Sequence, residues 1–180
     1  MSTPIYLAYI NGYQPLWANQ LPERLSHCLP FPMHRMDVQF DLDLFYAPER
    51  NQYHSTLILA QLLKHLPDDS AKIIGITNVD LYIPILTFVF GESQLDGNGA
   101  VISTFRLRNE YYGLPEDKDL FLERIVKEAL HELGHSFGLI HCADYQCVMN
   151  SSTYVEDIDL KYAHFCSTCK DQIGATCEKM

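Results

Sequence analysis

The segment from His131 to His141, HELGHSFGLIH, constrains this chain more than any other part of its sequence. Residues four apart on a helix lie one turn above each other, so His131 and His135 can present ring nitrogens to one metal ion at about 2.0–2.1 Å. Gly138 can adopt the left-handed conformation that ends a helix, which would turn the chain so that His141 approaches the same ion. We therefore expect a zinc site with three neutral imidazole ligands and one open position.

Zinc sites that keep an open position are catalytic, whereas structural zinc sites are closed by protein ligands. Water in that position has a pKa lowered toward about 7, and Glu132, next to His131, is the predicted general base. The expected reaction is hydrolysis of a peptide bond without a covalent intermediate, in which Glu132 passes the captured proton to the leaving amine. The motif leaves two alternatives open: an inactive zinc site, or surface histidines on an ordinary helix.

Four cysteines form a second cluster immediately after this motif. Cys142 and Cys147 are separated by four residues, Cys166 and Cys169 by two, and eighteen residues lie between the pairs. Such pairs favour a closed structural zinc site of four thiolates, which would tie the segment carrying His141 to a C-terminal helix around Cys166 and Cys169. Chance disulfides or free thiols are the alternative.

The remaining candidate ligands lack such spacing. Cys28 and Cys177 have no partner pattern and are expected to be plain thiols. The other histidines are expected to be ordinary surface or core residues: His27, His34, His54, His65 and His164.

Charge and length narrow the class of protein. The chain has 180 residues, and 13 Lys and Arg against 23 Asp and Glu give a formal charge of -10. This field should repel phosphate backbones and anionic lipids, so neither nucleic acid nor a membrane is an expected partner. The N-terminal apolar run stops at Asn11-Gly12, too early for a signal peptide, and no stretch approaches a membrane span. A single domain, cytoplasmic and by default monomeric, is expected.

Hydrophobic spacing in the first eighty residues predicts alternating strands and helices. The expected strands are Ile5–Ile10, one within Phe31–Leu42, and Lys72–Thr77. The expected helices are one within Pro15–Leu29, interrupted near Pro22, and Ser55–His65, which Pro67 stops. This order favours an α/β fold with parallel strands joined by right-handed crossovers.

After the first eighty residues the pattern of strands and helices changes. Thr87–Glu92 and Ala100–Leu107 are strand-like and are linked by the turn-rich Asp96-Gly97-Asn98-Gly99, which favours an antiparallel pair with one edge strand. An edge strand at Thr87–Glu92 could pair with an extended substrate through main-chain hydrogen bonds. The segment Asp117–Phe137 has helical spacing and carries the histidine motif.

The extended histidine motif resembles that of the metzincins. Together with Cys142, Cys147, Met149 and the later Cys166 and Cys169, it is similar to the archaemetzincins. This resemblance implies an α/β fold (α+β, of the zincin type). Such a fold has a twisted, mixed five-stranded sheet, an active-site helix and a small C-terminal subdomain. Residues 1–180 would form one catalytic domain, with subdomains at 1–138 and 139–180.

The resemblance also implies a catalytic and a structural zinc ion, and peptidase activity of an aminopeptidase-like kind on peptide or protein substrates. Met149 would form an apolar floor beneath the catalytic zinc. Some metzincins carry a tyrosine two residues after this methionine; here Ser151 occupies that position, so no role is assigned to the next tyrosine, Tyr154. Two rival functions remain: a zinc-stabilised, non-catalytic interaction module, and a zinc amidohydrolase acting on small amides.

Overall fold

A computed structural model describes residues 3–177 of the chain, and the side chains of residues 3–174. Its centre is a five-stranded sheet in the order β2-β1-β5-β8-β7, formed by β1 (Ile5–Ile10), β2 (Met33–Val38), β5 (Lys72–Thr77), β7 (Gly91–Ser93) and β8 (Gly99–Ser103). Strands β2, β1, β5 and β8 are parallel, and β7 pairs antiparallel with β8 at the edge. The predicted α/β class and mixed five-stranded sheet are confirmed.

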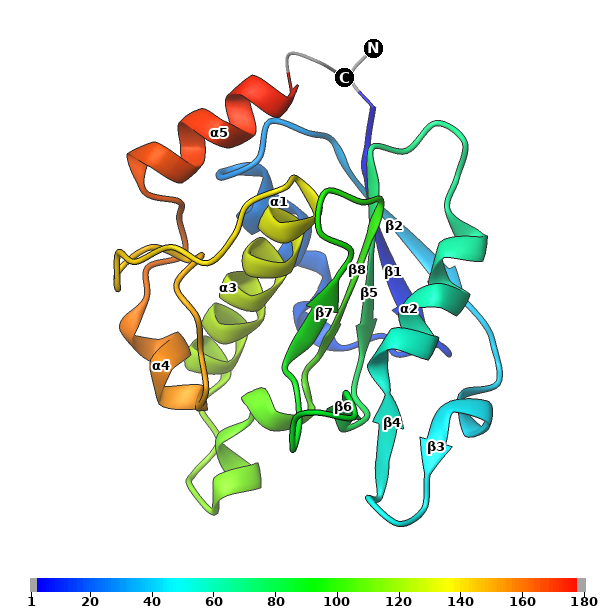
Figure 1. Cartoon of the computed structure of the whole chain (residues 1–180). Coiled ribbons are helices and arrows are strands. Elements are labelled where there is room, and N and C mark those ends of the chain that lie inside the picture. Colours follow the sequence, from blue (N-terminus) through cyan, green and yellow to red (C-terminus); the bar gives the residue numbers. More distant parts are fainter. Residues whose placement is uncertain (1–2, 178–180) are drawn as a thin grey trace.

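Helices cover both faces of this sheet (Figure 1). On one face lie α1 (Leu21–Ser26) and α3 (Lys118–Ser136); on the other lies α2 (Ser55–Leu62). The central strands are therefore nearly continuous apolar runs, as expected where both faces are buried. In β1, Leu7 and Tyr9 join the core beneath α3, while Ala8 and Ile10 join the core beneath α2. Each fully buried Leu or Ile stabilises the fold by about 1.5–3 kcal/mol.

The remaining elements lie around this sheet. Short 3-10 helices occupy Leu16–Asn19, Leu42–Phe45, Leu63–His65, Phe105–Leu107 and Asn109–Tyr112. A small sheet in the order β3-β4-β6 is formed by β3 (Tyr46–Ala47), β4 (Gln52–His54) and β6 (Leu81–Tyr82). After α3 come α4 (Val155–Leu160) and α5 (Ser167–Cys177), which lie on the far side of α3 from the sheet (Figure 1).

Two predicted boundaries were wrong, and one predicted interruption is confirmed. The strand predicted at Thr87–Glu92 is only Gly91–Ser93, and Val89 makes just an isolated bridge to Leu81. The strand predicted at Ala100–Leu107 ends at Ser103, where the Oγ of Ser103 accepts a hydrogen bond from the backbone N–H of Phe105 (3.0 Å) and a 3-10 turn follows. The interruption predicted near Pro22 lies at Gln20, between the 3-10 helix Leu16–Asn19 and α1. Pro22 is in the first turn of α1, where its missing N–H is not needed.

Among residues 3–177, no helix combines the length and the apolar composition that crossing a bilayer requires.

Candidate active site

Helix α3 positions the first two histidines. Asp117 caps its N-terminus by accepting a hydrogen bond from the backbone N–H of Leu120 (2.9 Å), and the helix is buried against the sheet. The Nδ1 of His131 donates to the carbonyl oxygen of Val148 (2.8 Å), and the Nδ1 of His135 donates to that of Leu139 (2.7 Å). Because a carbonyl can only accept, the Nε2 atoms carry free lone pairs, and they lie 3.1 Å apart.

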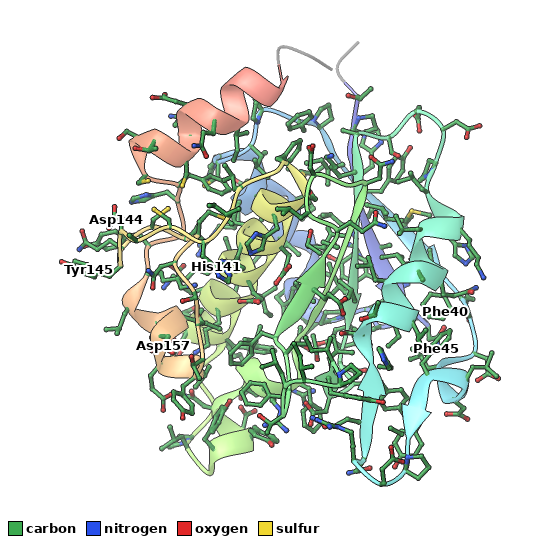
Figure 2. All side chains as sticks on the ribbon, in the orientation of Figure 1. Phe40, Phe45, His141, Asp144, Tyr145 and Asp157 are labelled. Atoms are coloured by element: carbon green, nitrogen blue, oxygen red, sulfur yellow. The ribbon has the colours of Figure 1, made fainter. Side chains whose placement is uncertain are left out.

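Gly138 brings the third histidine to the same point. Its φ of 90° is in the left-handed region, and the backbone N–H of Leu139 bonds back to the carbonyl of Gly134 (3.0 Å). The ring centroid of His141 then lies 5.3 Å from that of His131 and 4.9 Å from that of His135. Figure 2 shows His141 on the segment beyond α3, while Asp144 and Tyr145 lie at the outer tip of the next loop.

The three rings fit a tetrahedral zinc ion. One ligand atom from each histidine lies within 4.8 Å of the others, and two nitrogens bound at about 2.05 Å in tetrahedral geometry would be about 3.3 Å apart. Burial lowers the pKa of His131 well below its usual value, and the nearby Lys161 lowers it further. Burial also lowers the pKa of His135 and His141. All three rings are therefore held in the neutral form that binds metal.

Glu132 lies beside these rings with 6% of its surface exposed. Burial raises the pKa of its carboxyl group well above the usual range, and the neighbouring carboxylates of Glu128 and Glu92 raise it further, whereas Lys161 lowers it. On the sheet side, Gly91 approaches the Glu132 side chain so closely that an added Cβ would lie 2.7 Å from its Cγ. The carboxylate is thus confined between α3 and the edge strand β7.

A pocket of ≈ 320 Å³ opens over the histidines and Glu132. The edge strand β7 and the preceding residues, with Phe88 and Phe90, form one wall, and Ser151 and Ser152 form part of another. A second hollow adjoins it beside His135 and His141, lined by the exposed side chains of Leu95 and Ile140. A substrate here would meet carboxylates at the centre and apolar side chains at the rims.

The four predicted thiolates come together next to this site. Their sulfurs lie within 4.8 Å of one another, with 3.8 Å between the Sγ atoms of Cys142 and Cys166. The backbone N–H of Cys166 donates to the Sγ of Cys147 (3.3 Å), and Cys169 is buried. No disulfide joins the cysteines whose side chains are described. The donor set and its compactness fit a closed zinc site.

Comparison with known proteins assigns the family. The family model described as "Peptidase family M54" matches residues 29–175. The chain belongs to peptidase family M54. It is a zinc metallopeptidase by this membership, and the histidine and cysteine groups agree with that class.

Several relatives that the chain matches are named archaemetzincin. The chain is 46% identical to archaemetzincin of Methanocaldococcus jannaschii over 132 residues, covering 73% of this chain and 72% of the relative. It is 40% identical to archaemetzincin of Archaeoglobus fulgidus over 156 residues, covering 87% of this chain and 88% of the relative.

Solved structures agree with this assignment. The crystal structure of archaemetzincin from Methanopyrus kandleri superposes with a TM-score of 0.86 at 32% identity, covering 98% of this chain and 96% of the other. The crystal structure of a zinc-dependent peptidase from Methanocorpusculum labreanum gives a TM-score of 0.85 at 33% identity, covering 94% of this chain and 99% of the other. The M54 fold is thus shared over nearly the whole chain.

The segment around Met149 links the two candidate metal-binding groups of this M54 chain. Met149 is fully buried, and its sulfur packs against Gly134 of α3. Its carbonyl accepts a hydrogen bond from the backbone N–H of Cys142 (2.9 Å). The preceding carbonyl, that of Val148, is the one that orients His131. Met149 therefore packs against α3, and its role as an apolar floor beneath a zinc ion stays a prediction.

Other predicted residues lie apart from both groups. Tyr154 is 65% exposed and does not line the pocket. The Sγ of Cys28 donates to the carbonyl of Ala163 (3.1 Å), and the ring of His164 stacks on Tyr162. The side chain of Cys177 lies outside the described residues. Sequence reasoning missed Glu92, Glu128, Lys161 and Ser152, which come from four separate segments and match no spacing rule.

Proposed function

We propose that this chain hydrolyses peptide bonds at a zinc ion held by His131, His135 and His141, with Glu132 as the general base. The observation that carries the proposal is the gathering of three neutral imidazoles within 4.8 Å beside a buried carboxylate, at the floor of a pocket. When bound, zinc supplies a Lewis acid that polarises a carbonyl group and lowers the pKa of water.

Glu132 is suited to move the proton. Its raised pKa, caused by burial and by Glu128 and Glu92, makes its carboxylate a stronger base than an exposed one. It accepts a proton from the attacking water and delivers it to the leaving amine. Its confinement against Gly91 keeps the carboxylate at one position throughout these transfers.

The charges around the pocket favour substrates with a free amino terminus. Glu92, Glu128 and Glu132 line the pocket, and none of the described lining residues is Lys or Arg. The carboxylate of Glu92 is held by the hydroxyls of Ser55 and Thr56, the latter at 2.7 Å. A protonated α-amine would be attracted to this wall, which supports aminopeptidase-like cleavage over internal cleavage.

The test compares peptides that have free or acetylated amino termini, incubated with the protein as isolated without chelators. Wild type should cleave the peptides with a free amino terminus faster than the acetylated ones. Glu92→Gln should reduce the ratio of these two cleavage rates. Glu132→Gln should retain its zinc but lose peptide turnover by a factor of about 10²–10⁴. Turnover of small amides with none of peptides would favour an amidohydrolase. Full zinc content with no turnover of either would favour an interaction module.

We further infer that Cys142, Cys147, Cys166 and Cys169 hold a second, structural zinc ion. The compact four-sulfur group supports this, and reduced thiols support residence in the reducing cytoplasm. Metal analysis should find two zinc ions per chain; one would contradict the assignment. The subdomain boundary near Gly138 and the monomeric state stay predictions, which proteolysis and sedimentation would test.

A further inference from the structure

The apolar wall of the pocket over the histidines is an irregular segment of chain. Residues 83–90 (the wall segment) connect β6 to β7 and belong to no helix or strand (Figure 1). The wall segment nevertheless supplies five apolar side chains to the pocket: Ile83, Leu86, Phe88, Val89 and Phe90. Contacts other than a continuous β ladder must therefore hold these side chains in place.

Two long side chains of the β3–β4 hairpin hold the middle of the wall segment. The Nη2 of Arg50 donates to the carbonyl oxygens of Leu86 (2.7 Å) and Thr87 (3.1 Å). The buried Nε2 of Gln52 donates to the carbonyl of Thr87 (2.9 Å) and to the carboxylate of Asp80 (3.1 Å). The backbone of the wall segment is thus joined to Asp80 by a chain of hydrogen bonds.

Arg106 connects Asp80 to a side chain of the wall segment. Its guanidinium group donates to both oxygens of the Asp80 carboxylate, from Nε at 2.6 Å and from Nη2 at 2.7 Å, which fixes the plane of the group. The Cζ of Arg106 lies 4.2 Å from the ring centroid of Phe88 and 4.9 Å from that of Tyr111, within the range of cation–π attraction. Only 19% and 10% of the two paired side chains are exposed, so water competes little for these contacts.

Phe88 extends this network to the pocket. It lines the pocket together with His131 and Glu132, and it is partly buried, so some of its surface stays accessible. Its ring also contacts that of Phe90, with 5.2 Å between centroids and an interplanar angle of 77°. Arg106 and Phe90 therefore hold the ring of Phe88 before any substrate enters.

We propose that Arg106 is a positioning residue for substrate selection: locked by Asp80, it fixes the ring of Phe88 so that the wall segment binds a large apolar side chain of the peptide, next to the bond that is cleaved. Arg106 does not itself line the pocket and acts through Phe88. Burial of a Leu or Phe side chain against this wall favours such a peptide over its Ala counterpart by about 10- to 100-fold. The inference rests on the proposed peptidase function and deepens it by naming the class of substrate.

The experiment uses the zinc-loaded protein and peptides with a free amino terminus, in which the residue on either side of the cleaved bond is Ala, Leu, Phe or Lys in turn. In wild type, Leu or Phe on one side should raise kcat/KM by about 10- to 100-fold over Ala, mainly through a lower KM. Arg106→Lys keeps the charge but loses the bidentate pair. It should lower this preference by about fivefold or more, with turnover of the Ala peptides within about twofold of wild type and zinc content unchanged. Phe88→Ala should lower the preference at least as much.

Two further variants separate selection from folding. Asp80→Asn combined with Arg106→Gln leaves no unpaired charge, so it serves if the single variant does not fold, and it should show the same loss of preference. Arg24→Lys is the matched control, because it alters another Arg–carboxylate pair, with Glu123 (2.7 Å), whose residues do not line the pocket. It should keep the wild-type preference.

Several results would overturn the proposal: no preference for Leu or Phe in wild type, a preference for Lys over Phe, or an Arg106→Lys protein that keeps the wild-type preference or loses turnover of every peptide equally. A preference lost in Leu95→Ala but kept in Phe88→Ala would place the selection in the neighbouring hollow and also overturn it. Calorimetry with two hydroxamates that differ only in a benzyl or a methyl side chain measures the same preference without turnover. Arg106→Lys should lose affinity for the benzyl compound alone. Tighter binding of the benzyl compound by a wild type that cleaves no peptide would refute the peptidase function but support the selection, so the two failures are distinguishable.

Discussion

Gly91 has no side chain, and the geometry of the site depends on this, because there is no room for a methyl group at this position. An added Cβ would lie 2.7 Å from the Cγ of Glu132, 2.9 Å from its Oε1 and 2.8 Å from the carbonyl oxygen of Val101. We predict that Gly91→Ala displaces the Glu132 carboxylate and lowers kcat by about 10- to 100-fold, or about 1.4–2.7 kcal/mol, with zinc content unchanged. Steady-state kinetics would measure this. Gly174→Ala, where the added methyl meets nothing within 4 Å, is the control; an equal loss in both variants would contradict the prediction.

Glu128 should make stability depend on pH. Burial raises its pKa from 4.5 to about 7, an effect that Lys161 opposes. The folded state then binds a proton that the unfolded state has released. The stability associated with this group is fully present below about pH 4.5 and is lost as pH rises through about 7.

Replacing Glu128 by Gln removes that titration. The free energy of unfolding of Glu128→Gln, minus that of wild type, should increase between pH 4.5 and 8 by up to about 3 kcal/mol. Urea unfolding of both proteins across this range would test it. Loss of the charge pairing with Lys161 adds an offset that does not change with pH, so the pH dependence of the difference decides the test. A difference that is flat with pH would refute the raised pKa.

At the scale of elements, β7 presents a free edge to the pocket. The carbonyl of Phe90 accepts from the N–H of Ser103 (2.8 Å), and the N–H of Gln94 donates to the carbonyl of Gly99 (3.0 Å). In an antiparallel ladder the alternate residues, Gly91 and Ser93, therefore direct their backbone groups away from β8. An extended substrate could pair with them.

Ser93→Pro tests this pairing, because it removes an outward N–H without removing a bond of the ladder. We predict that KM for peptides rises at least tenfold while the melting temperature changes little. Ser93→Ala, which keeps the N–H, should behave as wild type in both respects. Unchanged kinetics in the proline variant would mean that substrate does not pair with β7.

The elements differ in how well their sequences predict them. Strands Ile5–Ile10 and Lys72–Thr77 were predicted at their observed bounds, since both are buried apolar runs bounded by polar residues. The edge strand β7 was misplaced because its apolar neighbours Phe88 and Phe90 line the pocket instead of continuing the ladder. The small sheet and α4 were missed because two- and three-residue strands and a six-residue helix have too few positions to show a period.

The residues of the candidate site also differ in how well the sequence predicts them. The His131 to His141 motif and the four cysteines could be recognised because their spacing in sequence is also their geometry in space. The Val148 carbonyl that orients His131 is a backbone group, which every residue has, so no sequence pattern indicates it. Glu92 and Ser152 reach the pocket only through long-range packing.

At the scale of the whole molecule, the two candidate metal-binding groups share one stretch of chain. His141 and Cys142 are adjacent, and between Cys147 and Met149 lies the Val148 carbonyl that holds His131. We predict that Cys169→Ser lowers total zinc by about one ion and also weakens zinc binding at the histidines at least tenfold, consistent with the effects of altered outer-shell partners. Competition with a chromogenic chelator would measure both. Cys28→Ser, outside the group, should change neither; histidine-site affinity that survives Cys169→Ser would show that the groups are independent.

We expect this shared stretch to make peptide cleavage sensitive to redox chemistry. If peroxide joined Cys142 and Cys166, whose sulfurs are 3.8 Å apart, the turn beneath α3 would shift and His131 would lose its orienting carbonyl. A reductant would then restore turnover without any repair of the histidines. We therefore expect peptide turnover only where the surroundings keep these thiols reduced.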